Sequence, residues 1–268
     1  MTGSAGPAVE AARNEGRAAL VGYLPAGFPD VDSSIALIQA MIDGGCDVIE
    51  IGLPYSDPVM DGPTIQAAAE RALSAGMRTR DVFRVVEASA ARVPTLVMTY
   101  WNPIERYGVE RFAADLASVG GAGLITPDLT PDEGGEWIAA ADEHDLDKVF
   151  LVAPSSTAAR LASTADACRG FIYATAVMGV TGVREQQSDL APTLVARTRE
   201  VTDKPVCVGL GVSHGAQAAG VAAFADGVIV GSAFVKAVDG AESDGMDAAA
   251  RAVEALARDL SRGVRREL

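Results

Sequence analysis

The chain has 268 residues, of which 49% are hydrophobic and only 5% aromatic, and it carries 22 Lys plus Arg against 36 Asp plus Glu, a net charge of −14. This length suits one large domain or two small ones, and aliphatic side chains must fill the core. The excess of negative charge argues against partners such as nucleic acid or an anionic membrane surface, because like charges repel.

Cysteine and histidine are sparse. Cys46, Cys168 and Cys207 lack the spacing of metal ligands, and the chain has 2 histidines. We therefore expect free buried thiols in a reducing compartment, and no metal site. Residues 1–16 lack the apolar segment of a signal peptide, and no run approaches the ~18 apolar residues of a membrane span. These features predict a cytoplasmic protein.

Short apolar segments alternate with amphipathic ones from the N-terminus onwards. A short helix at 7–17 precedes a strand at 18–24. The next helix has apolar residues every three or four positions, with Asp30 or Asp32 as its cap and a Gly-Gly pair at its end. The elements predicted after it are a strand at 47–53, helices at 64–74 and 79–91, a strand at 95–100, a helix at 109–119 and a strand at 122–126.

The second half of the chain repeats this pattern. A helix at 131–144 begins with Pro and acidic residues, which helix N-termini prefer, and a polar loop with glycines occupies 178–190. The other predicted elements are strands at 148–153, 170–174, 205–210 and 226–230, helices at 158–165, 191–201 and 218–223, and a final helix with Met246, Ala249, Val253, Leu256 and Leu260 on its inner face.

Eight nearly continuous apolar strands, each followed by a helix, predict a parallel sheet that is covered on both faces. A (β/α)8 barrel usually takes ~250 residues, which matches this chain. A doubly wound open sheet is the alternative, but no GxGxxG fingerprint follows the first strand. No linker divides the sequence. We therefore expect a single (β/α)8 barrel domain over residues 1–268, with an extra N-terminal helix.

The segment IEIGLPYSDPVMDGPTIQ carries two acidic residues in unusual places. Glu50 interrupts an apolar strand, where a carboxylate is costly unless it is paired or used. Asp61 follows in a Pro-rich loop. An isolated strand Glu is most often a paired core residue. Here both residues fall at the carboxyl end of a parallel strand, where active sites are built in such folds, and this position favours a catalytic role.

Three glycine-containing turns follow the last strands. They are GVTG at 179–182, GLGV at 209–212 and VGSA at 230–233. Glycine lets backbone N–H groups approach an anion, and a helix N-terminus adds a favourable dipole. Each turn alone is weak evidence for a phosphate site, but their joint placement after the last three strands favours one. Since GLGVSHGA and VGSAFV contain no Lys or Arg, backbone amides and the Ser232 hydroxyl would have to hold the phosphate.

Several segments in this order resemble the tryptophan synthase alpha chain family. They are GYLPAGFPD, IEIGLPYSDPVMDGPTIQ, MTYWNPI, GVTG, GLGV and VGSA. The resemblance extends over nearly the whole chain, and its most specific part runs from Glu50 to Gln66, which other phosphate-binding barrels lack. It implies cleavage of indole-3-glycerol phosphate to indole and glyceraldehyde 3-phosphate, with no cofactor in this chain.

The resemblance also implies the roles of individual residues. Glu50 is expected to be the acid and base, and Asp61 the second catalytic acid. The residues expected in the substrate pocket are Tyr23, Tyr100, Tyr173 and Thr181. Those expected to bind the phosphate are Gly182, Gly211, Gly231 and Ser232. Each tyrosine could instead be ordinary core, and Thr181 an ordinary loop hydroxyl.

The chemistry of this cleavage requires two acids. Direct cleavage would expel an aryl carbanion from indole C3, so C3 must first be protonated. One carboxyl group can donate that proton and then accept the side-chain hydroxyl proton. An ionised carboxylate near the ring nitrogen would stabilise its positive charge. Glu50 in an apolar strand should protonate more readily, and Asp61 in a polar loop should stay ionised.

A partner is also implied by the resemblance. The family docks on a beta chain that binds pyridoxal phosphate, in an expected alpha2beta2 complex. Loops with Pro and acidic or amide residues follow the second, third and fourth strands, and rigid loops lose little entropy on docking. The residues expected at this interface are Asp57, Pro58, Asn102, Pro103 and Pro131. Two alternatives stay open: another phosphate-binding barrel enzyme, and a non-catalytic activating subunit.

Overall fold

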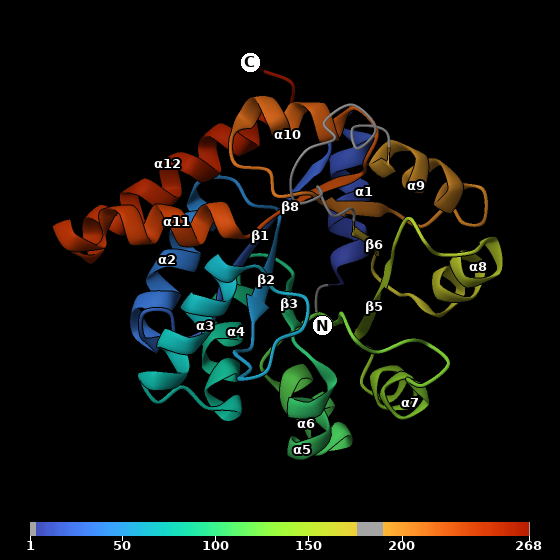
Figure 1. Cartoon of the computed structure of the whole chain (residues 1–268), viewed down its shortest axis with the longest axis horizontal. Coiled ribbons are helices and arrows are strands. Elements are labelled where there is room, and N and C mark those ends of the chain that lie inside the picture. The colour runs from blue at the N-terminus through green and yellow to red at the C-terminus, as the bar shows by residue number, and fades with distance from the viewer. Residues whose placement is uncertain (1–3, 176–189, 268) are drawn as a thin grey trace.

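Eight parallel strands form a closed barrel in the computed structural model, which describes residues 4–175 and 190–267 (Figure 1). The strands pair in chain order, and the last pairs with the first. They are β1 Ala19–Pro25, β2 Val48–Gly52, β3 Thr95–Met98, β4 Gly123–Thr126, β5 Asp147–Val152, β6 Ile172–Thr175, β7 Val206–Gly209 and β8 Gly227–Val230. All eight predicted strands are present, which confirms the (β/α)8 barrel.

Helices surround the barrel on its outer side (Figure 1). In the described residues they are α1 Ala5–Asn14, α2 Val31–Asp43, α3 Pro63–Ser74, α4 Val82–Ala90, α5 Trp101–Tyr107, α6 Val109–Ser118, α7 Gly135–Glu143, α8 Ala158–Ala167, α9 Leu190–Arg199, α10 Gly215–Ala222, α11 Ser232–Ala241 and α12 Met246–Val264. The cap of α2 is Asp30, whose carboxylate accepts the Ser33 N–H at 2.9 Å. None of these helices is long and apolar enough to cross a membrane.

Two helical segments differ from the sequence prediction. Helix α5 was not predicted, because seven residues are too few to establish a helical period. Its first N–H, that of Trp101, donates to the carboxylate of Asp128 at 2.9 Å, a contact from another loop that the local sequence cannot reveal. Helix α7 begins at Gly135 and not at residue 131, since residues 131–133 form a turn.

Strand residues point alternately into the barrel and towards the helices. In β2, Ile49 and Ile51 pack in the outer layer between the strands and helices, whereas Val48 belongs to the inner core of the barrel. Glu50 lies between the two isoleucines and therefore faces inwards. This alternation places a carboxyl group inside the barrel.

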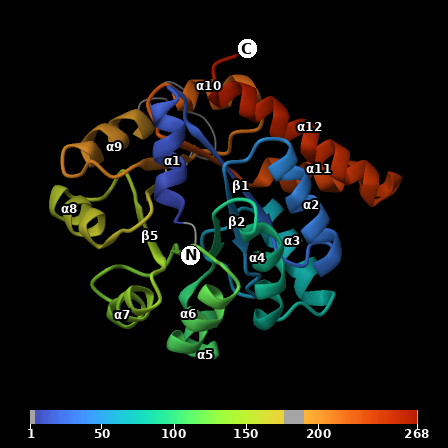
Figure 2. The same ribbon diagram turned by 180° about the vertical axis from the view of Figure 1, so that it is seen from behind.

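Helix α1 closes the N-terminal end of the barrel, where it lies across the strands in the view from behind (Figure 2). Its residues Ala5, Val9 and Ala12 are buried among inward-facing strand residues. The carboxylate of Asp147 fixes the start of α1 by accepting the Ser4 hydroxyl at 2.8 Å and the Ala5 N–H at 2.7 Å. Helix α1 therefore fills the N-terminal end of the barrel interior.

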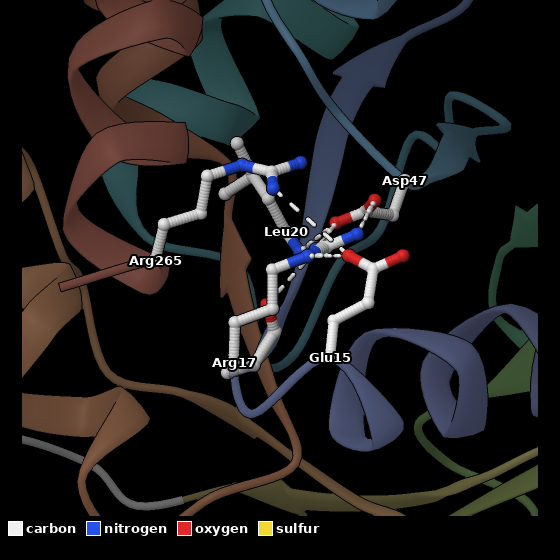
Figure 3. A network of polar contacts seen from close by, with 6 residues as sticks. Glu15, Arg17, Leu20, Asp47 and Arg265 are labelled. Atoms are coloured by element: carbon white, nitrogen blue, oxygen red, sulfur yellow. Dashed lines mark hydrogen bonds and ion pairs between the residues drawn. The ribbon is translucent and has the colours of Figure 1, made fainter. Parts of the chain in front are cut away.

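A polar network ties the turn after α1 to β2 (Figure 3). The guanidinium of Arg17 donates to both oxygens of Asp47, at 2.7 and 2.9 Å. Asp47 also accepts the Leu20 N–H at 2.8 Å, and Arg17 donates to Glu15 at 2.7 Å. The side chains of Arg17 and Asp47 are only 10% and 18% exposed, so water screens this pair weakly.

We expect Arg17→Met to lower the free energy of unfolding by about 2 kcal/mol, because it leaves the Asp47 carboxylate enclosed without its charge partner. Urea denaturation measures the change. The matched control is Arg84→Met, which breaks an ion pair to Asp32 whose side chains are 63% and 83% exposed. That variant should lose less than about 0.5 kcal/mol. Equal losses in the two variants would contradict the expectation.

Candidate active site

A cavity of about 530 Å³ opens at the C-terminal end of the barrel. Its walls include the end of the loop after β2, the turns after β7 and β8, and the starts of α3 and α11. Its floor consists of inward-facing strand residues, namely Tyr23, Glu50, Met98, Leu151, Tyr173, Gly209 and Ile229. Both acids singled out in the sequence line this cavity.

Glu50 is fully buried at the cavity floor. Within the described residues, neither of its carboxyl oxygens has a hydrogen-bond partner. Burial disfavours the carboxylate and raises the pKa of Glu50 from its ordinary value of 4.5 to about 8. At neutral pH Glu50 therefore holds a proton, as expected for a group that acts first as an acid.

Asp61 lies in the cavity wall and is half-buried. The side-chain amide of Gln66 donates to its backbone carbonyl at 2.7 Å and fixes the end of the loop. Burial raises the pKa of Asp61, and the Tyr100 hydroxyl partly opposes that shift. We expected this loop to be polar. The structure gives Asp61 a more enclosed environment, because the loop folds over the barrel.

Tyr23 stands beside Glu50 on the neighbouring strand β1, Tyr173 stands on β6 across the barrel, and both line the cavity. A glycine makes room for each hydroxyl. A Cβ atom on Gly52 would lie 2.2 Å from the Tyr23 hydroxyl, and one on Gly209 would lie 2.8 Å from the Tyr173 hydroxyl. Burial raises the pKa of both phenols well above their usual value, so they stay neutral.

Tyr100 lies one layer behind the cavity, outside the described residues that line it. Its hydroxyl accepts the Met60 N–H at 2.9 Å, and its ring contacts that of Tyr55 with centroids 5.4 Å apart. Tyr100 therefore holds the loop that carries Asp61. Its contacts in the structure are with this loop, and the contact with substrate stays a prediction.

The predicted phosphate residues Gly211, Gly231 and Ser232 meet at one side of the cavity. Gly211 has a φ of +68°, a left-handed conformation that favours glycine. Gly231 precedes the first turn of α11, which has no side-chain cap, so the first N–H groups of α11 lack intrahelical partners and face an anion readily. Gly182 and Thr181 lie outside the described residues.

Lys236 also lines the cavity, although the segments GLGVSHGA and VGSAFV contain no Lys or Arg. It lies in α11, four residues after Ser232, and residues four apart share one face of a helix. That spacing is the signal in the sequence that could have revealed it.

Of the five predicted interface residues, Asp57, Pro58 and Pro131 lie on loops that follow β2 and β4, and Asn102 and Pro103 lie in the first turn of α5. Asp57 and Asn102 are exposed, and the three prolines are half-buried. A groove of about 360 Å³ runs between the loops after β2 and β3, lined by Tyr55, Ser56, Asn102 and Pro103 among others. The described residues contain no group of three or more His, Cys, Asp or Glu placed to hold a metal ion.

Comparison with known proteins identifies close relatives. The family model for the tryptophan synthase alpha chain matches residues 9–265. The tryptophan synthase alpha chains of Nocardia farcinica and Acidothermus cellulolyticus are each 60% identical to this chain, over 95% and 97% of it and over 93% and 97% of their own lengths. A crystal structure of tryptophan synthase from M. tuberculosis, in its open form, is 53% identical with a TM-score of 0.87 and covers 97% of this chain and 98% of its own.

The raised pKa of Glu50 predicts a loss of stability with rising pH. From about pH 5 to pH 8, the folded chain keeps a proton that the unfolded chain has released, so the free energy of unfolding falls across this window. Glu50→Gln removes this effect. Its stability relative to the wild type should therefore rise from pH 5 to pH 8 by on the order of 3 kcal/mol, measured by urea denaturation.

A matched control is Glu70→Gln, which changes an exposed carboxyl group on α3. Its stability difference from the wild type should stay nearly constant over the same pH range. If the Glu50→Gln difference were equally flat, the Glu50 carboxyl would not be protonated in the folded chain.

Proposed function

This chain belongs to the tryptophan synthase alpha chain family, the lyase component of that complex in tryptophan biosynthesis, and we propose that its barrel cavity cleaves indole-3-glycerol phosphate with Glu50 and Asp61 as the two catalytic acids. The observation that carries this assignment is the buried Glu50 carboxyl group, without a hydrogen-bond partner in the described residues, at the floor of the cavity that Asp61 also lines. The products are indole and glyceraldehyde 3-phosphate.

Glu50 supplies and then removes a proton. Its carboxyl group, with a pKa raised to about 8, donates a proton to C3 of the indole ring, and the ring becomes an indolenine. The resulting carboxylate then takes the proton of the hydroxyl group on the adjacent side-chain carbon. The bond between C3 and that carbon breaks, its electrons return to the ring, and the carbon becomes the aldehyde. Glu50 therefore ends the reaction cycle in the same protonated form in which it began.

Asp61 stabilises the charged ring. Protonation at C3 places positive charge on the ring nitrogen, and an ionised carboxylate at the cavity wall offsets that charge. The half-buried position of Asp61 strengthens this interaction, since fewer waters screen it. The same burial raises the pKa of Asp61. A positively charged ring nearby opposes this shift and favours the ionised form that the reaction needs.

The cavity suits a flat aromatic ring and a phosphate at opposite ends. Met98, Leu151 and Ile229 give an apolar floor, Tyr23 lies next to Glu50, and Tyr173 faces the cavity from the opposite side of the barrel. Gly211, Gly231 and Ser232 offer backbone N–H groups and a hydroxyl at the start of α11. We include Gly182 in the phosphate site and Thr181 near Asp61 on the family resemblance alone.

The proposed partner is a tryptophan synthase beta chain, which holds the pyridoxal phosphate in this family. An alpha2beta2 stoichiometry, a cytoplasmic location and one domain over residues 1–268 are part of the same proposal. No cofactor is assigned to this chain. Indole is small and apolar, so direct transfer to a partner would avoid its loss to solvent.

The loop that carries Asp61 fits a docking surface. Val59 and Met60 are 79% and 52% exposed, an unusual position for large apolar side chains. Tyr100 holds this loop through the Met60 N–H, and Asp128 holds the start of α5 through the Trp101 N–H. The three loops after β2, β3 and β4 are therefore joined into one surface, and binding there would act on Asp61 directly.

We expect Glu50→Gln to lower the rate of indole release from indole-3-glycerol phosphate by at least ~10²-fold, because an amide cannot donate and then accept the proton. Glu70→Gln should keep the wild-type rate. Far-ultraviolet circular dichroism verifies that both variants are folded. Near-normal turnover by Glu50→Gln would remove Glu50 from the mechanism.

Asp61→Asn should reduce indole release severely, since a neutral amide cannot offset the charge on the ring nitrogen. The expected loss is about 10²-fold, similar to removal of one electrostatic contact in the transition state. Single-turnover measurements report on the chemical step. An unchanged single-turnover rate would assign Asp61 a structural role in the loop.

Asp57→Ala should weaken stimulation by the beta chain more than it weakens basal indole release, because Asp57 is exposed on the proposed docking surface. Titration with beta chain measures both quantities. Asp203→Ala is the matched control, since Asp203 is an exposed acid before β7 at the opposite end of the barrel. A beta chain that neither binds nor stimulates the wild type would overturn the proposed partner.

A further inference from the structure

The three lysines of the chain have different surroundings. Lys148 forms an ion pair with Asp142, and Lys204 donates to the backbone carbonyls of Ala165, Asp166 and Cys168 at 2.7–3.1 Å. These two lysines therefore stabilise the fold. Lys236 is exposed, lines the main cavity and has no hydrogen bond or ion pair to another described residue.

The acids next to Lys236 are engaged elsewhere. Asp239, three residues further along α11, lies 3.1 Å from the guanidinium of Arg71 in α3. Arg71 also binds Glu242, at 2.8 Å. Arg71 thus engages both carboxylates and offsets one of their two charges, which reduces their competition for the Lys236 ammonium group. The ammonium stays available to a negatively charged ligand in the cavity.

The position of Lys236 in α11 gives no advantage to the helix itself. A cation gains from the helix dipole only in the last turn of a helix, and Lys236 is the fifth of the ten residues of α11. Side chains of a helix tilt towards its N-terminus, so the Lys236 side chain extends back over the turn that holds Ser232. Gly231, Ser232 and Lys236 line the same side of the cavity.

We propose that Lys236 binds the phosphate group of the substrate through its ammonium group, together with the backbone N–H groups and the hydroxyl at the start of α11. This role rests on the proposed function and extends it. It adds a cation to the amides and the hydroxyl that the sequence predicts for the phosphate site.

The charges around the cavity explain why a cation is needed. The chain carries a net charge of −14, and acidic Asp61 lines the cavity that must admit a phosphate dianion, whereas protonated Glu50 adds no charge. The dipole and N–H groups at the start of α11 act on an anion at short range, whereas an ammonium group carries a full charge that acts at a longer distance. A single ammonium group at the cavity mouth lowers the repulsion of the phosphate and selects phosphorylated substrates over neutral ones. The contribution should weaken with salt, because Lys236 is exposed.

The test compares Lys236→Gln and Lys236→Arg with the wild type, with Arg251→Gln on the exposed face of α12 as the control. Binding of inorganic phosphate is measured by calorimetric titration at low and high salt. We expect Lys236→Gln to weaken phosphate binding about three- to tenfold at low salt, and less at high salt. Lys236→Arg should stay within about twofold of the wild type because it keeps the charge.

Kinetics provide the second measurement. In Lys236→Gln the KM for indole-3-glycerol phosphate should rise by a similar factor while kcat changes less than about twofold. With indole-3-glycerol, which lacks the phosphate, the variant and the wild type should react alike. Unchanged phosphate affinity in Lys236→Gln, or an equal loss in Arg251→Gln, would overturn the role of Lys236.

The outcomes also separate this inference from the proposed function. A wild-type chain that binds phosphate through Lys236 but releases no indole would support the role of Lys236 and overturn the proposed reaction. If the wild type releases indole normally and Lys236→Gln binds phosphate as well as the wild type, the proposed reaction is supported and the role of Lys236 is overturned. Absence of phosphate binding by the wild type would overturn the inference itself.

Discussion

The active site depends on the burial of one carboxyl group inside a closed barrel. Glu50 has no hydrogen-bond partner within the described residues, and burial raises its pKa to about 8. Such a group costs stability, and the surrounding strands must hold it in place. The closed barrel provides this support, since every strand is paired on both sides and the helices cover the outer layer. The burial that destabilises the Glu50 carboxylate also keeps this carboxyl group protonated, so that it can donate a proton.

The N-terminal end of the barrel stabilises the fold, whereas the C-terminal end carries the cavity. At the N-terminal end, α1 fills the opening, and Arg13, Arg17, Arg199 and Arg266 line a small cleft. Arg13 and Arg199 lie in the last turns of α1 and α9, and Arg266 donates to the last carbonyl of α10 at 2.7 Å. Guanidinium groups at helix C-termini offset the partial negative charge there. This end stabilises the fold and leaves the C-terminal end to chemistry.

The loop from β2 to α3 links chemistry to docking. It carries Asp61 and Met60 into the cavity wall and leaves Val59 exposed to solvent. The Tyr100 hydroxyl accepts the Met60 N–H, so a change in the loop after β3 reaches Asp61 through one hydrogen bond. A partner that bound these loops would change the position of a catalytic acid, which is a direct physical route for activation.

The barrel and the unusual positions of Glu50 and Asp61 could be predicted from the sequence, because the period of apolar residues, the order of the elements and a Glu in an apolar strand are local signals. The resemblance to a known family added the reaction and the partner. Only the tertiary structure decided which groups meet: the half-burial of Asp61, the contact of Tyr100 with the loop, helix α5 capped by Asp128, and Lys236 in the cavity. These features depend on residues distant in the chain. Burial and partner choice follow from packing, which no local pattern encodes.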